Sequence, residues 1–207
     1  MKVLTVLALL ASILAAPAPA PEPVPDLPYL PSPGVATDFT DNFDDLEVSG
    51  VGTVLPRTQR VNQYGALFYR DFVYSDDTLS LFFAPPSPKN FIGFSAVGRV
   101  FPQLCPTDKF QTFDLKSLYY ACIINTFVPV NVPASCTIKF LGRRKDGDTV
   151  FEQVDYAAQS FGAKYNKVTF RKEFSGLTQL DISVNNNNPF LVALFDDIEY
   201  TAYKQEN

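Results

Sequence analysis

Short stretches in which apolar and polar residues alternate recur along most of the chain. Near the C-terminus Leu180, Ile182 and Val184 alternate with polar residues, and in an earlier segment Ile138 and Phe140 do the same. A period of two is typical of strands that bury one face. The pattern therefore predicts an all-β fold, a jelly-roll-like antiparallel two-sheet β-sandwich. We expect its first and last strands to lie side by side.

Turn-forming residues separate these stretches at chemically sensible places. Asp146-Gly147 lies between two alternating runs and predicts a hairpin turn. The proline-rich segment 84–90 cannot continue a central strand, and the asparagine-rich segment 185–189 tolerates left-handed backbone geometry. Residues 114–120 could form one helical turn, but the aromatic and β-branched residues that follow favour a strand.

The N-terminal segment carries the features of an export signal. Lys2 precedes an apolar run over residues 3–15, and small residues follow it. The run is too short to cross a membrane, and no later run reaches the roughly 20 residues that a span requires. We predict a signal peptide over 1–20, cleaved between residues 15 and 20, and a secreted protein, extracellular or in the cell wall.

A proline-rich segment follows the predicted signal peptide. Eight prolines occur between residues 17 and 33, and such a composition favours an extended, semi-rigid tether. A proline-rich ligand for another protein is the alternative interpretation. We predict a linker over 21–36 and one β-sandwich domain over 37–207, long enough to bury a core of its own.

Composition excludes several classes of function. The chain has 207 residues, 19 of them Phe and 10 Tyr, with no Trp and no His. Without histidine there is no histidine-based triad, no histidine-ligated zinc or copper and no ordinary pH switch. The net charge of −5 becomes −6 when Lys2 leaves with the signal peptide. A negative protein has no electrostatic basis for binding nucleic acid.

Three cysteines fit an exported protein, since disulfides form outside the cytosol. Cys122 and Cys136 lie in two strand-like runs joined by a proline-containing loop, and a bridge between them would close a 15-residue loop. Cys105 is then a free thiol or an intermolecular link, or it is itself the partner of Cys122, because pairing cannot be deduced from sequence. Catalysis by Cys105 would need a histidine neighbour, and the chain has none.

Two pairs of acidic residues lie near the two ends of the predicted domain. Asp44-Asp45 belongs to the first pair and Asp196-Asp197 to the second, each within an apolar strand pattern. A carboxylate that such a pattern buries requires a compensating partner. Three roles compete: acid and base around a glycosidic bond, oxygen ligands of a structural calcium ion, or acceptors for backbone amides at a strand end.

The C-terminal Leu-Phe-Asp-Asp-Ile-Glu-Tyr sequence (residues 194–200) resembles the closing strand of carbohydrate-binding jelly-roll modules. In several of those families the first aspartate and an acidic residue of the opening strand bind structural calcium. The resemblance thus implies Asp196 as a metal ligand, with Asp44 or Asp45 opposite it, and calcium as the one cofactor.

A wider set of motifs resembles a group of small secreted fungal β-sandwich proteins of unknown function. It comprises Phe-Asp-Asp-Leu at 43–46, the element at 63–72, the runs at 110–122 and 132–142, and the closing strand. The chain departs from that group at Ala66, where the second glycine is usual, at Tyr69, beside the usual tryptophan position, and at Asp71, where asparagine is usual. The resemblance implies a fold and a location and no activity.

Tyrosines are the candidate ligand-binding residues, because sugar rings stack on exposed aromatic side chains and tryptophan is absent. Tyr64, Tyr69 and Tyr74 lie in what reads as one strand, with Tyr69 on the face opposite to the other two. A stripe in the core is an equally good interpretation of Tyr64 and Tyr74.

We therefore expect a non-catalytic binding protein, with cell-wall carbohydrate as its ligand. The alternative is a secreted effector or elicitor-like protein that acts through a host or surface protein. No residue constellation in the sequence indicates an enzyme.

Overall fold

The computed structural model describes residues 35–47, 58–76, 83–87, 89–95, 101–124, 132–158, 163–185 and 188–204. The predicted signal peptide, nearly all of the predicted linker and residues 186–187 of the asparagine-rich segment lie outside these ranges. Within them the chain forms strands and no helix: β1 (Ala36–Asp41), β2 (Thr58–Tyr64), β3 (Leu67–Asp76), β4 (Phe83–Ala84), β5 (Asn90–Ser95), β6 (Gln103–Pro106), β7 (Thr112–Ile124), β8 (Val132–Pro133), β9 (Cys136–Arg144), β10 (Thr149–Tyr156), β11 (Ala163–Lys164), β12 (Asn166–Thr169), β13 (Leu177–Asn185) and β14 (Leu191–Tyr203).

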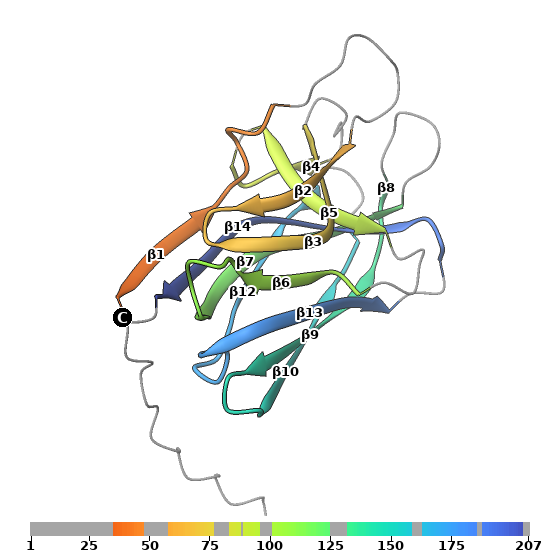
Figure 1. The fold of residues 1–207 in the computed structure, drawn as a ribbon. Helices are drawn as coiled ribbons and strands as arrows, with labels where there is room; N and C mark the ends of the chain where they lie inside the picture. The colour runs from red at the N-terminus through yellow and green to blue at the C-terminus, as the bar shows by residue number, and fades with distance from the viewer. Residues whose placement is uncertain are drawn as a thin grey trace, which may run out of the picture. The chain divides into compact units, whose positions relative to one another are not determined.

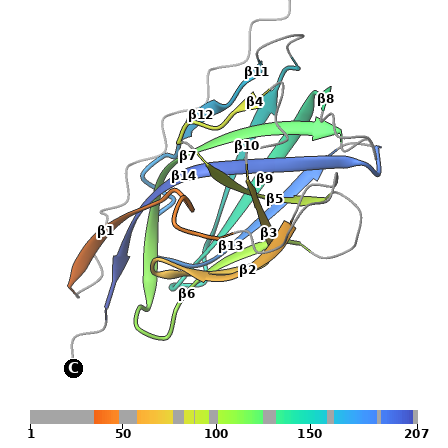
Figure 2. The same cartoon turned by 90° about the horizontal axis from the view of Figure 1, so that it is seen from above.

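The two longest strands, β7 and β14, pair antiparallel along most of their length (Figure 1). The first half of β14 also pairs with β5, and its second half pairs with β1. The expected adjacency of the first and last strands is thus confirmed, with Asp41 opposite Ile198. Figure 2 shows β7 and β14 on one side of the core and β2 and β6 on the other.

The remaining strands form a second, larger surface. In it β10, β9, β13, β6 and β3 follow one another as hydrogen-bonded neighbours, and β2 flanks β3. Because β3 also pairs with β5, and Leu177 of β13 pairs with Phe113 of β7, six strands close into a ring. The all-β class and the antiparallel pairing are confirmed, apart from the short parallel pair β4–β11. The ring joins the two expected sheets at their edges, so the pairings do not establish a jelly-roll sandwich.

The run expected to form one strand around Tyr64 is a hairpin. Gly65 has a φ of +54°, in the left-handed region that suits glycine, and it turns the chain between β2 and β3. The prediction that Tyr64 and Tyr74 share a face along one strand was therefore wrong in its premise. Gly65 is a turn signal in the sequence, but the aromatic residues on both sides of it favour a continuous strand.

A second irregularity changes which side chains of β3 face the core. Asp71 has a φ of +63°, and the chain bulges there, since Val61 pairs with Phe72 while Gln63 pairs with Phe68. The strand also changes neighbours near this point, from β6 to β5. As a result the side chains of residues 69, 72 and 74 are all buried, although 69 and 72 differ in parity.

Aromatic rings fill much of the core between the two surfaces. Phe72, Phe94 and Phe195 contact one another with ring centroids 5.7–6.1 Å apart, and Phe140 reaches Phe195 from β9. Edge-to-face contacts of this kind stabilise a core beyond the burial of apolar area. Phenylalanine side chains thus make up a large part of the core.

Other local predictions are also confirmed. Cys122 and Cys136 form a disulfide, and Cys105 is free and half-buried. The Asp146-Gly147 turn joins β9 to β10, with the amide of Arg144 donating to the carbonyl of Asp148 at 2.9 Å. Residues 114–120 lie within strand β7 and form no helical turn.

Candidate functional site

Two of the three tyrosines proposed to bind a ligand are buried. Tyr69 is 1% exposed and Tyr74 is 7% exposed. The hydroxyl of Tyr74 donates to the backbone oxygen of Glu47 and to Gln59. Tyr64 is only half-buried, but its ring packs on Phe43 with centroids 4.8 Å apart. In this structure the three side chains form part of the interior, and no exposed tyrosine platform exists among them.

The feature that sequence reasoning missed is a buried carboxyl group, that of Asp41, which is 2% exposed. The hydroxyls of Tyr69 and Tyr200 donate to the same Asp41 oxygen at 2.6 and 3.0 Å. The Tyr200 hydroxyl in turn accepts the backbone amide of Ala66 at 2.9 Å. One carboxyl group thereby connects β1, β3, β14 and the β2–β3 turn.

Burial governs the protonation of Asp41. Removal from water raises the pKa of Asp41 from 3.8 to about 7, and the hydrogen bonds from Tyr69 and Tyr200 oppose that rise only in part. The same burial, together with the negative charge of Asp41, raises the pKa of Tyr69. Asp41 lies three residues before the acidic pair Asp44-Asp45 in the sequence, but its inward orientation follows from the register of β1 against β14.

Asp196 is fully buried and is held by local donors. Its carboxylate accepts the amide of Ser87 at 3.2 Å, the hydroxyl of Ser87 at 3.1 Å and the amide of Asp197 at 2.9 Å. Burial raises the pKa of Asp196 to about 7, and the neighbouring Asp197 adds to the rise. Asp197 adopts a φ of +44° where β14 bulges against β7. Acceptance of amides at a strand irregularity is the role that these contacts describe.

The acidic residues of the opening segment have partners of their own. Asp45 accepts the Tyr64 hydroxyl at 2.6 Å, and Asp44 accepts the amide of Asn90 at 3.4 Å. Burial raises the pKa of Asp197, and the charge of Asp44 adds to that rise. The two ends of the domain approach each other here, since Asp41 lies opposite Ile198. In the part of the chain that the structure describes, no three acidic or cysteine side chains are grouped as a metal site. Calcium binding at Asp44, Asp45 and Asp196 stays a prediction.

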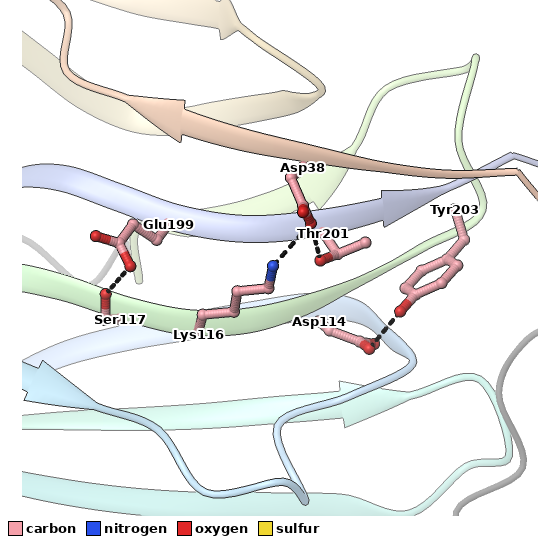
Figure 3. Close-up of polar contacts among 7 residues, drawn as sticks. All are labelled: Asp38, Asp114, Lys116, Ser117, Glu199, Thr201 and Tyr203. Atoms are coloured by element: carbon pink, nitrogen blue, oxygen red, sulfur yellow. Dashed lines mark hydrogen bonds and ion pairs between the residues drawn. The ribbon is translucent and has the colours of Figure 1, made fainter.

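The outer surface of β1, β14 and β7, which we call the paired face, is dominated by polar side chains that bind one another (Figure 3). Lys116 donates to Asp38 at 2.7 Å, and Thr201 donates to the same carboxylate oxygen. Ser117 donates to Glu199 at 2.7 Å, and Tyr203 donates to Asp114 at 2.7 Å. The hydrogen-bonding capacity of this surface is therefore largely used within the protein.

The outer surface of β10, β9, β13, β6 and β3, which we call the open face, differs in this respect. Strand registers place one side chain from each strand in a single row across it. The row comprises Phe151, Leu141, Asp181, Gln103 and Arg70, each opposite the next. Neighbouring strands lie about 4.8 Å apart, so the row spans about 19 Å.

A second row lies beside the first, one residue pair along the strands. It comprises Gln153, Lys139 and Ser183, directly opposite one another. Their side chains have no hydrogen bond or ion pair to any other residue that the structure describes. The first row adds apolar surface, since Phe151 is 49% exposed and stands opposite the partly exposed Leu141. An aromatic ring beside unengaged amide, ammonium and hydroxyl groups can bind a ligand that has both apolar faces and hydroxyls.

Gly65 is the position at which the Asp41 network is most easily tested. A Cβ atom there would lie 2.3 Å from Asp41 Oδ1 and 2.6 Å from the Tyr200 hydroxyl. We predict that Gly65→Ala lowers the free energy of unfolding by about 3 kcal/mol, because left-handed strain adds to the disruption of buried hydrogen bonds. Gly176→Ala is the matched control, since Gly176 has a φ of +63° with nothing within 4 Å. Urea denaturation should show a loss of only about 1 kcal/mol there, and equal losses would contradict the prediction.

Stability should fall as pH rises. The pKa values of Asp41 and Asp196 are about 7 in the folded protein and near 3.8 when unfolded. A raised folded pKa gives stability that is complete below about pH 4 and is lost as pH rises through 7. Between pH 5 and pH 8 we expect a loss of about 3 kcal/mol per carboxyl group. Urea midpoints should show that loss reduced in Asp41→Asn and unchanged in Asp108→Asn, which alters an exposed carboxyl. A wild-type midpoint that does not fall would refute the expectation.

The calcium prediction is tested by thermal unfolding. A ligand that binds only the folded state raises the melting temperature. If Asp196 is a ligand, millimolar calcium should raise the melting temperature relative to a chelator, and Asp196→Asn should abolish that rise. Identical melting curves of the wild-type protein in calcium and in chelator would contradict the prediction that the folded protein binds calcium.

Comparisons with known proteins show no family for this chain. No family model matches it, and no curated protein matches it. Among solved structures, the K2 cleaved adhesin domain of Lys-gingipain is 14% identical with a TM-score of 0.40, covering 79% of this chain and 97% of that domain. The CBM22-1 xylan-binding domain of Xyn10C from Paenibacillus barcinonensis is 15% identical with a TM-score of 0.30, covering 81% of this chain and 95% of that domain. Among the described residues no helix is long and apolar enough to cross a membrane.

Proposed function

We propose that this protein is a secreted, non-catalytic binding protein whose open face holds an extended carbohydrate chain of the cell wall. The observation that carries the proposal is the row of five side chains that crosses five strands from Phe151 to Arg70. An extended polymer that lies across the strands would contact every member of that row.

The chemistry of the rows suits a sugar chain. A pyranose ring has an apolar face that stacks on an aromatic ring and a rim of hydroxyls that requires hydrogen-bond partners. Phe151 and Leu141 supply apolar surface, while Gln103, Gln153 and Ser183 supply amides and a hydroxyl. Phe101, which is 61% exposed, lies two residues before Gln103, just before β6 begins.

Non-catalytic binding accords with the position of Asp41 and Asp196, the two described carboxyl groups whose pKa is raised to about 7. Asp41 and Asp196 are 2% and 0% exposed, and each is held by donors of the protein itself. A general acid must reach the bond that it protonates. Secretion accords with the Cys122–Cys136 disulfide, which is typical of oxidising compartments. A jelly-roll-like arrangement of the two surfaces belongs to the same proposal.

The test is retention of the full mature chain on insoluble chitin, β-glucan and cellulose, with a pair of matched variants. Phe151 and Phe190 are 49% and 46% exposed, but Phe190 belongs to the turn before β14 and lies off the open face. Phe151→Ala should weaken retention about fivefold to tenfold, as expected for the loss of a stacking contact worth about 1 kcal/mol. Phe190→Ala should bind like the wild type.

Two results would overturn the proposal. If no glycan retains the wild-type protein, the effector-like alternative with a protein partner becomes the better account. If Phe151→Ala and Phe190→Ala weaken retention equally, the open face is not the binding surface.

A further inference from the structure

The charge distribution on the open face points to the kind of glycan, an inference that rests on the function proposed above. Two acids lie on the strands that flank Lys139, Asp155 on β10 and Asp181 on β13, and both have hydrogen-bond partners. Asp181 accepts Arg143 Nε at 3.1 Å and Gln179 Nε2 at 2.6 Å, and Asp155 accepts the Thr137 hydroxyl at 2.6 Å. Neither carboxylate forms an ion pair with Lys139, and only Asp181 is paired with a cation, Arg143.

Lys139 lies at the centre of the open face and forms no ion pair with any residue that the structure describes. It stands between Gln153 and Ser183 in the second row. Several described lysines and arginines have no ion pair, hydrogen bond or cation–π contact with another described residue. Lys139 is the one among them that is half-buried, and the others are exposed: Arg60, Arg70, Lys89, Lys109, Lys164 and Lys172.

Partial burial makes Lys139 a better anion-binding group than an ordinary surface lysine. Its aliphatic stem is held by the sheet, so less side-chain freedom is lost when the ammonium engages a ligand. Gln153 and Ser183 lie on the two neighbouring strands, whose backbones are about 4.8 Å to either side of β9. A carboxylate at Lys139 would thus have neutral donors beside it for the hydroxyls of the same sugar.

We propose that the open face selects carboxylated glycans, polymers of uronic acid, with Lys139 as the residue that receives the carboxylate. The protein as a whole repels such polymers, because its net charge is −5. Binding to a polyanion therefore cannot come from general electrostatic attraction, and it requires a local cationic site. Phe151 and Leu141 provide the stacking surface for the sugar ring beside that site.

The experiment compares two ligands that differ only in charge. Affinity electrophoresis of the full mature chain would use polygalacturonate and its fully methyl-esterified form as probes. An exposed ion pair is worth up to about 1 kcal/mol, so we expect about threefold to fivefold tighter binding to the acid form. High salt should remove that difference.

Variants assign the difference to one side chain. Lys139→Gln should bind both forms equally, and Lys139→Arg should keep the preference for the acid form. The matched control is Lys167→Gln on β12, where Lys167 binds Glu199 of the paired face at 3.1 Å, and it should behave like the wild type. Circular dichroism and melting curves of each variant establish that it is folded.

The outcomes separate this inference from the function on which it rests. Equal wild-type binding to the acid and ester forms, or an unchanged preference in Lys139→Gln, overturns the inference and leaves carbohydrate binding intact. Failure to bind either form or any of the insoluble glycans overturns both.

Discussion

The buried carboxyl group of Asp41 is the interaction on which the arrangement of the domain depends. It receives hydroxyls from Tyr69 and Tyr200, and through Tyr200 it also reaches the backbone of Ala66. The first strand, the β2–β3 hairpin and the last strand are far apart in sequence, yet each contributes to this one cluster. A polar group buried to this degree is costly unless its hydrogen bonds are made, so the cluster favours one relative placement of the three segments over others.

The sequence predicted the class of the fold because alternation survives in most strands. The pairs Ile138 and Phe140, and Leu180 and Ile182, face the core as their spacing indicated. The predicted strand boundaries and faces were wrong where a single residue has left-handed backbone geometry. Gly65 turns a presumed strand into a hairpin, and Asp71 reverses the parity of the residues after it. A non-glycine residue in that geometry carries no dependable signal in one sequence, so the positions of Tyr69 and Tyr74 could not be derived.

The candidate site was less predictable than the fold for a related reason. Period-two spacing already placed Lys139 opposite in direction to Ile138, on the outside of its strand. It could not show that Gln153 and Ser183 stand on either side of Lys139, because period-two spacing does not give the register of β10 or of β13 against β9. The acidic pairs illustrate the converse. Their sequence pattern suggested catalysis or calcium binding, whereas in the structure Asp45 binds a tyrosine and Asp196 binds backbone amides and a serine.

The contrast between the two outer surfaces carries the functional argument. Both are rich in polar side chains, and composition alone would not distinguish them. On the paired face, Asp38 is bonded to Lys116 and Glu199 to Lys167 of β12, and both acids also accept neighbouring hydroxyls. A ligand there would have to break existing bonds, and the gain would be small. On the open face the side chains of Gln153, Lys139 and Ser183 have no partner among the described residues. A ligand that matches their spacing would therefore replace solvent without breaking contacts within the protein.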